Sequence, residues 1–592
     1  MPTVILTGPP VPGSPLSDEL LSLGFDVRPV TGPEDAAAAL ADVPADQRVA
    51  VVDSAFVGHV HALRLALTDP RFDACAVTGA LAVRGDARAA LDEAVALAPE
   101  ALGAGPYPDR LAAAVEGSGT TVQRPELGTL VAAVPAGEAE RESAVAAVAA
   151  VDDEAVRLRT AVKSRDGFFT TFFISPYSRY IARWCARRGL TPNQVTTASL
   201  ITALIAAGCA ATGDRWGYVA AGVLLLVSFV LDCTDGQLAR YSLQYSTMGA
   251  WLDATFDRAK EYSFYAGLAL GAARNGDDVW GLALGAMILM TCRHVVDFSF
   301  NEANHDATAN TSPTAALSDR LDSVGWTVWV RRMIILPIGE RWAMIAVLTA
   351  VTTPRVVFYA LLIGCAFGAL YTTAGRVLRS LTRKATRTDR AAQALADLAD
   401  SAVLAWTSAR TGKRPDRAAV WLAGLASLLL TGAALTRDFG DPWLIGTALV
   451  YVVISGAAVE RPLKGSLDWL IPPFFRFAEY VTVLVLAWKA DVPGALPAAF
   501  GLVAAVAYHH YDTVYRIRGG SGAPPHWLVR VTGGHEGRVL LTVVLATVLA
   551  RDAFPVALTA MAVFVALVVL VESIRFWVSS GAPAVHDEGE PA

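Results

Sequence analysis

The chain has 592 residues, of which 54% are hydrophobic and 18% charged. Soluble domains average about 45–50% apolar and about 25% charged residues, so the composition argues against a wholly soluble protein. The net charge of −6, with no Lys/Arg run interleaved with aromatic residues, argues against a nucleic-acid binder. The six cysteines form no CxxC pair, which suits a reduced compartment and gives neither a disulfide framework nor a structural zinc site.

The first 155 residues are predicted to form a soluble α/β domain. Apolar runs at 3–6 and 49–52 are typical of buried strands, and the Ala- and Leu-rich stretch 87–98 is typical of a helix. No Lys or Arg followed by an apolar segment opens the sequence, so we expect no secretory signal and a cytosolic N-terminus.

Twelve apolar stretches follow, most of them near the ~20 residues that a helix needs to cross a bilayer. The first six are predicted at 195–212, 216–231, 249–272, 279–300, 342–353 and 356–378. The second six are predicted at 418–436, 443–459, 469–489, 495–515, 539–550 and 555–577. We therefore expect a polytopic α-helical membrane protein of about twelve spans, arranged as two six-helix halves at 156–385 and 417–580.

Lys and Arg residues gather in alternate loops between these spans. Arg183, Arg187 and Arg188 precede the first span, and Arg240 follows the second. By the positive-inside rule we expect both termini to be cytosolic, in the inner (plasma) membrane. The linker at 386–416 is predicted to be an amphipathic helix on the cytosolic face, and residues 581–592 a disordered tail.

Four carboxylates lie where the second span ends and the third begins. Asp232 and Asp235 are three residues apart and Asp253 and Asp257 four apart, so each pair shares a helix face. Acids in apolar helices are costly and usually mark function, and four together would repel one another. A divalent cation resolves this conflict, and oxygen ligands without His or Cys favour Mg²⁺ or Mn²⁺ acting together with substrate phosphates.

Neighbouring residues fit a phosphate ligand. Gly236 and Gly249 leave room for a ligand to approach the backbone, and Arg240 can neutralise a phosphate oxygen. Together with the four acids, these residues form one predicted site at the cytosolic end of the helices. The alternative is that the acids cap helices and form ion pairs, with Arg240, Arg258 and Lys260 as their partners.

The segment has the pattern D-x2-D-G-x2-A-R-x8-G-x3-D-x3-D, with every fixed position present. It resembles the signature of the CDP-alcohol phosphotransferases, integral membrane enzymes that make phospholipid head groups. The stretch Thr191-Pro192-Asn193 is similar to the T-P-N at the start of that family's first membrane helix. The resemblance implies six helices in the catalytic unit, usually within a homodimer.

The resemblance also implies roles for individual residues. Two divalent ions, Mg²⁺ or Mn²⁺, would be held by the first three aspartates of the motif, and Asp257 would be the general base that deprotonates the acceptor alcohol and a further metal ligand. The metal ligands would be Asp232, Asp235, Asp253 and Asp257. The cytidine pocket and the diphosphate would be contacted by Gly236, Ala239, Gly249 and Arg240.

The activity implied is transfer of a substituted phosphate from a CDP-alcohol to an alcohol, with release of CMP, in phospholipid biosynthesis. The donor would be of the CDP-diacylglycerol or CDP-inositol type and the acceptor inositol phosphate or glycerol phosphate, with membrane lipid as a further partner and no nucleic acid. Two other interpretations stay open. One is a twelve-span transporter with two related halves, and the other a non-catalytic membrane scaffold with a vestigial site.

A second resemblance concerns the region before the first span. Residues 163–167 and the basic stretch 179–188 resemble the start of enzymes that join CDP-inositol to inositol phosphate, where a sugar nucleotidyltransferase domain often lies upstream. Residues 1–155 would correspond to that upstream nucleotidyltransferase domain. Their loop from Thr7 to Gly13 contains prolines and no Lys or Arg, so we expect a degenerate nucleotidyltransferase-like domain without catalysis of its own.

Arginines beyond the motif are candidates for binding an acceptor phosphate. They are Arg293, Arg331 and Arg332. The alternative is that Arg293 pairs with Asp297 on one helix face and that the loop arginines follow the positive-inside rule. No carboxylates stand at zinc-ligand spacing from His509 and His510, so these are predicted to be structural.

The second membrane half is predicted to be a degenerate repeat of the first. GAWLDATFDRAKEY at 249–262 and LDWLIPPFFRFAEY at 467–480 share Trp, Leu, Phe, Arg, Glu and Tyr at a constant offset of 218. Asp253 and Asp257 correspond to Ile471 and Phe475, which cannot hold a metal. A silent half could take the place of a second protomer, giving an internal pseudo-dimer in place of a homodimer.

Overall fold

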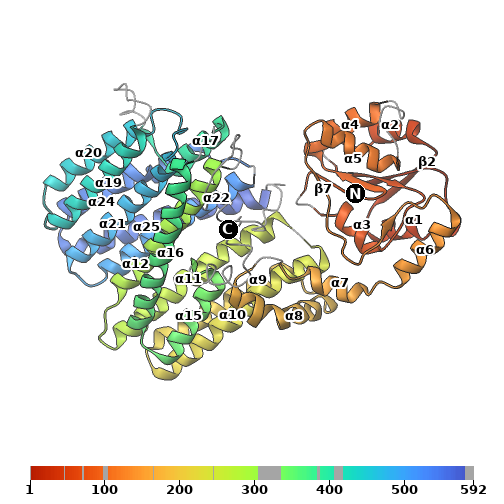
Figure 1. Ribbon diagram of the computed structural model, residues 1–592. Helices are drawn as coiled ribbons and strands as arrows, with labels where there is room; N and C mark the ends of the chain where they lie inside the picture. The colour runs from red at the N-terminus through yellow and green to blue at the C-terminus, as the bar shows by residue number, and fades with distance from the viewer. Residues whose placement is uncertain are drawn as a thin grey trace.

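The structure is a computed structural model that describes residues 2–45, 47–69, 72–97, 105–163, 166–244, 246–304, 335–382, 387–405, 418–519 and 521–579. An α/β domain built on a six-stranded sheet precedes a large assembly of long helices (Figure 1). The predicted tail at 581–592 and the end of the predicted linker, from 406 onward, lie outside the described residues.

The sheet of the N-terminal domain has the order β2-β1-β3-β6-β5-β7. Its strands are β1 (Thr3–Thr7), β2 (Asp26–Val30), β3 (Val49–Asp53), β5 (Ala74–Val77), β6 (Ala80–Val83) and β7 (Val122–Gln123). β6 runs antiparallel to both of its neighbours, whereas β2, β1 and β3 are mutually parallel. The α/β prediction for this region is confirmed.

Helices cover both faces of this sheet. One face packs against α1 (Leu16–Ser22) and α3 (Val60–Leu67), and the other against α2 (Pro33–Ala41), α4 (Arg88–Ala96) and α5 (Tyr107–Gly117). Because both faces are covered, β1 and β3 are apolar along their length and do not alternate with polar residues.

A short helix joins the domain to the helical assembly. After α6 (Glu138–Ala149), helix α7 (Asp153–Thr160) buries Val156 against Ala62 and Leu130 of the α/β domain. The other side of α7 contacts the long helix α10, where the Tyr241 hydroxyl donates to Glu154 at 3.1 Å. Next come the single turn η3 (Thr170–Ile174) and the amphipathic helix α8 (Ser175–Arg187).

Each of the twelve apolar stretches coincides with a helix. The first half contains α9 (Pro192–Thr212), α10 (Arg215–Ser242), α11 (Thr247–Arg274), α12 (Trp280–Asn304), α15 (Ile338–Val351) and α16 (Pro354–Thr382). The second contains α19 (Ala419–Thr436), α20 (Trp443–Ala458), α21 (Ile471–Ala490), α22 (Ala495–Arg518), α24 (Gly534–Val548) and α25 (Phe554–Ser579).

Seven helical segments of the described chain are long and apolar enough to cross a membrane, which makes this a multi-pass membrane protein. They include α9, α10, α12, α16 and α19, together with Asp468–Ala490 and Arg551–Ser579. α15 and α24 have only 14 and 15 residues, and α11 carries several charged residues. The count of twelve spans therefore stays a prediction.

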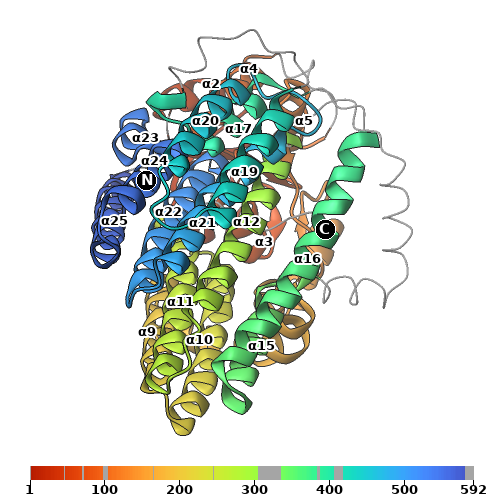
Figure 2. The same ribbon diagram turned by 90° about the vertical axis from the view of Figure 1, so that its left-hand side faces the viewer.

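The two sets of helices make matching contacts. α9 packs against α10 and α11, α10 against α15, and α12 against α16. In the same way α19 packs against α20 and α21, α20 against α24, and α22 against α25. In Figure 2, α9, α10 and α11 group at one end and α19, α20 and α24 at the other, with α12, α21 and α22 between them.

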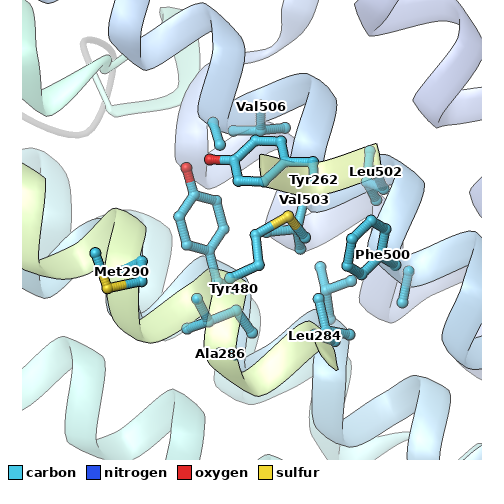
Figure 3. Close-up of a cluster of buried hydrophobic side chains, with 14 of the residues drawn as sticks. Tyr262, Leu284, Ala286, Met290, Tyr480, Phe500, Leu502, Val503 and Val506 are labelled. Carbon is cyan, nitrogen blue, oxygen red and sulfur yellow. The ribbon is translucent and has the colours of Figure 1, made fainter. Parts of the chain in front are cut away.

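The two sets meet along α11, α12, α21 and α22. Figure 3 shows this buried contact, in which Leu284 of α12 lies near Phe500 of α22. Trp280 of α12 also packs edge-on against the Phe500 ring, with ring centroids 5.6 Å apart. Tyr262 and Tyr480, which correspond at the offset of 218, are both buried here and lie near one another. The shared aromatic positions thus lie in the contact between the halves.

A second shared feature is a buried glutamate held by arginines. Glu261 of α11 accepts from Arg258 at 3.0 Å and from Arg341 of α15 at 3.3 Å. At the corresponding place Glu479 of α21 accepts from Arg476 at 2.8 Å and from Arg538 of α24 at 2.5 Å. The Arg and Glu that the two segments share therefore join equivalent pairs of helices.

The predicted linker helix packs against protein. α17 (Asp389–Ala399) buries its apolar face, including Leu395 and Leu398, and contacts α12, α21 and α22. Asp400, directly after α17, accepts from Arg476 at 2.8 Å and from Arg538 at 2.7 Å, and lies 3.2 Å from His509 Nε2. The amphipathic pattern is thus satisfied by the helical assembly, and a buried ion network fixes the end of the linker helix.

Replacing Asp400 by Ala is expected to destabilise the protein by about 3–5 kcal/mol, because two buried guanidinium groups lose a carboxylate. Thermal unfolding in detergent, followed by tryptophan fluorescence, measures the change. Asp389→Ala is the matched control, since the Asp389 side chain is 92% exposed beside Lys464. Equal stability of the two variants would contradict the role assigned to Asp400.

Candidate active site

The end of α10 and the start of α11 bring the predicted acids together. α10 ends at Ser242, where Leu243 takes a left-handed conformation with φ of 51°, and Ser246 caps α11 by accepting from the Gly249 N–H at 2.9 Å. Oxygens from the carboxylates of Asp232, Asp235 and Asp253 lie within 4.8 Å of one another. Residues spaced three or four apart on two helices thus converge on one point.

Asp257, one turn after Asp253, faces a buried ammonium group. Lys260 Nζ is 2.8 Å from Asp257 Oδ1, contacts Asp232 and lies 3.3 Å from Ser199 Oγ. The Lys260 side chain is 1% exposed, and its ammonium lies 5.6 Å from the centroid of the Trp342 ring. One of the sequence alternatives, pairing of the acids with Lys260, therefore holds for two of the four carboxylates.

Lys260 is the predicted ion-pair partner that the structure places within the acid cluster. Its i,i+3 spacing from Asp257 puts both side chains on the same helix face. Only the fold shows that it also reaches Asp232 of α10. Arg258, the other predicted partner on this helix, pairs with Glu261.

The donor set fits a divalent cation. The ammonium group of Lys260 pairs with two of the four carboxylates, and all the donors at the convergence point are oxygen atoms. Asp235 Oδ2 is buried and makes no hydrogen bond within the described residues. An orphaned buried carboxylate oxygen beside two further carboxylates is the arrangement that a hard cation stabilises, so Asp232, Asp235 and Asp253 could hold one.

The predicted CDP-contacting residues line the same region. A Cβ at Gly236 would lie 3.5 Å from Arg240 Nη1, so the guanidinium group lies over the glycine one turn away. A Cβ at Gly249 would lie 2.8 Å from Asn193 Oδ1, which places the T-P-N segment against that glycine. Ala239 is buried. Any larger side chain at Gly249 would force Asn193 to move.

Of the three arginines predicted to bind an acceptor phosphate, the structure describes only Arg293. Arg293 is buried on α12. Asp297, its proposed partner, pairs with Arg376 of α16 instead. Arg331 and Arg332 lie outside the described residues, within 305–334.

The corresponding place in the second half is filled by aromatic rings. Phe475, which stands where the first half has Asp257, stacks on His535 with ring centroids 4.3 Å apart. The Tyr451 hydroxyl lies 2.7 Å from His535 Nδ1, and all three side chains are fully buried. His509 lies in the Asp400 network, and His510 is buried.

The N-terminal loop carries no basic residue, and its backbone is held by the domain. Gly8 and Gly13 have positive φ values of 106° and 73°, and Ser54 Oγ donates to the Pro9 carbonyl at 2.8 Å. Burial raises the pKa of Asp53, at the end of β3 beside this loop. The degenerate nucleotidyltransferase-like character of the domain stays a prediction.

Two family models match the chain. Residues 389–592 match a family of unknown function (DUF5941), and residues 189–353, which contain the aspartate cluster, match the model described as CDP-alcohol phosphatidyltransferase.

Named relatives align with a limited part of the chain. The bifunctional IPC transferase and DIPP synthase of Aquifex aeolicus is 31% identical over 114 residues, which are 19% of this chain and 26% of that protein. The archaetidylinositol phosphate synthase of Pyrococcus horikoshii is 32% identical over 113 residues, 19% of this chain and 58% of that protein. The phosphatidylinositol phosphate synthase of Mycolicibacterium smegmatis is 35% identical over 123 residues, 20% of this chain and 53% of that protein.

Each of these alignments covers less than two thirds of the relative. The family match includes all the fixed positions of the aspartate motif, from Asp232 to Asp257. Over residues 189–353, this chain is therefore similar to the CDP-alcohol phosphatidyltransferases.

Proposed function

We propose that this protein transfers a substituted phosphate from a CDP-linked alcohol to an alcohol acceptor, with release of CMP, in phospholipid biosynthesis. The observation that carries the proposal is the convergence of Asp232, Asp235 and Asp253 beside Gly236 and its overlying arginine. The donor is of the CDP-diacylglycerol or CDP-inositol type. Relatives named as inositol phosphate lipid synthases favour inositol phosphate over glycerol phosphate as the acceptor.

The chemistry follows from the placement of the acids. Asp232, Asp235 and Asp253 would hold the divalent cations, Mg²⁺ or Mn²⁺, which would supply positive charge to polarise the donor phosphate and stabilise the CMP leaving group. Asp257 takes the proton of the acceptor hydroxyl, whose oxygen forms a new bond to the donor phosphorus while the bond from phosphorus to the CMP oxygen breaks. Lys260 holds the Asp257 and Asp232 carboxylates in position through its ammonium group.

The site is proposed to open at the cytosolic side of the inner membrane, with both chain termini on that side. The motif lies at the helix ends that are followed by Arg240 and preceded, at α9, by the basic helix α8. A donor with an acyl tail could then keep its tail in the bilayer and its nucleotide in water.

We further propose that the second half is a silent repeat that replaces a partner subunit. Matching helix contacts, equivalent buried Arg–Glu pairs and an aromatic cluster in place of the acids support this. The second half also covers α11, the helix that carries Asp253 and Asp257. Arg258 Cζ lies 4.8 Å from the centroid of the Tyr511 ring of α22. Trp577 of α25 stacks on Trp251, with ring centroids 6.4 Å apart.

The transporter and scaffold alternatives have less support. A transporter of two related halves is expected to draw polar groups from both halves to a midplane site, whereas here the acids come from α10 and α11 alone. A vestigial scaffold has no need of three converging carboxylates with a buried unsatisfied oxygen.

Asp257→Asn is expected to lower CMP release by about 100-fold or more, because a general base contributes on the order of 10²–10⁴ in rate. The assay uses purified protein with Mg²⁺ or Mn²⁺, CDP-diacylglycerol or CDP-inositol as donor, and inositol phosphate, glycerol phosphate, serine or inositol as acceptor. Asp438→Asn, at an exposed position, is the control. Folded, metal-loaded wild-type protein that releases no CMP from any pair would refute the proposed reaction for these substrates.

Lys260→Met is expected to destabilise the protein without metal by about 3–5 kcal/mol, since Asp232 and Asp257 lose their buried counter-charge. Added Mn²⁺ should then raise the melting temperature more than it does in wild type, because the cation replaces the missing charge. Differential scanning fluorimetry with and without Mn²⁺ measures both effects. The same Mn²⁺-induced shift in both proteins would count against this role.

The active particle is expected to contain one copy of the chain, with a protein mass of 62.4 kDa. Light scattering coupled to size exclusion measures the mass, and co-expression of two differently tagged copies tests association in the membrane. Activity confined to a two-copy particle would contradict replacement of the partner by the second half.

A further inference from the structure

A basic cavity lies beside the aspartate motif but outside it. The cavity, of about 410 Å³, is formed by α7, the turn η3 and α8. Three cations line it, Arg159, Lys163 and Arg179, together with the hydroxyl groups of Thr171 and Ser175. Val162 and Pro176 complete the lining of this open cavity, and no carboxylate lines it among the described residues, so its charged lining groups are all cations.

The cations of this cavity are not neutralised by the protein. Within the described part of the chain, no ion pair joins Arg159, Lys163 or Arg179 to an acid. Nε of Arg179 is buried and makes no hydrogen bond to any described residue. By contrast Arg183, one turn further along α8, pairs with Glu154. The cavity therefore keeps unused donors where neighbouring arginines are satisfied.

Hydrogen bonds attach this cavity to the helix that bears the motif. Gln237, directly after Gly236, donates to Ser175 Oγ at 3.4 Å and accepts from Ser178 at 2.7 Å. Arg240 donates to the carbonyl of Ala161, two residues before Lys163, at 2.6 Å. The cavity and the CDP-contacting residues thus belong to one connected structure.

The same segment also presents aromatic rings at the surface. Phe172, Phe173 and Tyr177 are 52%, 56% and 45% exposed. Exposed aromatic residues beside basic ones on an amphipathic helix are typical of the membrane interface. A ligand in the cavity would therefore lie at the level of lipid head groups.

We propose that this cavity is a phosphate-binding subsite, which holds the phosphate of a second ligand while the CDP-linked donor occupies the aspartate motif. Guanidinium and ammonium groups together with hydroxyl donors are the set that recognises phosphate oxygens. The phosphate comes either from a water-soluble phosphorylated acceptor or from an anionic phospholipid. The assignment of the ligand as a reaction partner rests on the proposed function, whereas binding itself does not.

The test measures binding and turnover separately, with the full chain in nanodiscs. Arg179→Gln and Lys163→Gln are compared with Arg188→Gln, which changes a cation of the same basic stretch outside the cavity. The soluble probes are inositol phosphate and unphosphorylated inositol, and binding is measured by calorimetry in an Asp257→Asn background. Anionic lipid is tested with phosphatidylglycerol in phosphatidylcholine discs.

The cavity variants are expected to weaken inositol phosphate binding by about tenfold or more, which is the effect of losing one charge-assisted hydrogen bond. Inositol binding and the KM for the donor should stay unchanged, as should all binding in Arg188→Gln. If only the dependence on phosphatidylglycerol falls, the subsite is supported with a lipid phosphate as its ligand. If neither probe responds in folded cavity variants, or if Arg188→Gln responds equally, the proposal is overturned.

Failure of the proposed reaction would be visible separately. Phosphate binding that is lost in the cavity variants, in a protein that releases no CMP, would support the subsite and refute the transferase assignment.

Discussion

Like charges crowded at the ends of two apolar helices are the constraint on which this structure depends. The carboxylates of Asp232, Asp235 and Asp253 converge at one point, Asp257 lies one turn further along α11, and Asp235 is buried. Burial of one unpaired carboxylate is costly, and four would be prohibitive without positive charge. The ammonium of Lys260 answers part of this constraint by pairing with Asp232 and Asp257. Asp232, Asp235 and Asp253 could hold a cation that answers the rest.

The second set of helices has Ile471 and Phe475 at the positions that correspond, at the offset of 218, to Asp253 and Asp257. Phe475, His535 and Tyr451 pack into one buried cluster at the corresponding place. The glutamate that joins the third and fifth helices is present in both halves, as Glu261 and as Glu479. Packing and ion pairing between helices are thus similar in the two sets, whereas the converging carboxylates found among the described residues belong to the first set.

Much of this organisation could be predicted from the sequence. Long apolar stretches identified the helices, and the fixed spacing from Asp232 to Asp257 identified the acid cluster, because both signals lie within short segments. The sequence offered Lys260 as a partner of the acids but did not indicate that it reaches Asp232 as well as Asp257, because Lys260 and Asp232 lie 28 residues apart on two different helices. The Asp400 network was missed for the same reason, as Arg538 follows Asp400 by 138 residues. The packing of α17 against other helices could not be predicted either, because an amphipathic pattern does not say whether lipid or protein covers the apolar face.

The chain that runs from α16 through α17 to α19 joins the two sets of helices covalently. The faces of α11 and α12 that meet α21 and α22 belong to one polypeptide, so their effective concentration is set by the connecting segment and not by the amount of protein in the membrane. Helices α11 and α12, supported in this way, keep α21 and α22 as neighbours at any expression level. Dilution into a large bilayer, which separates non-covalent subunits, leaves this contact intact.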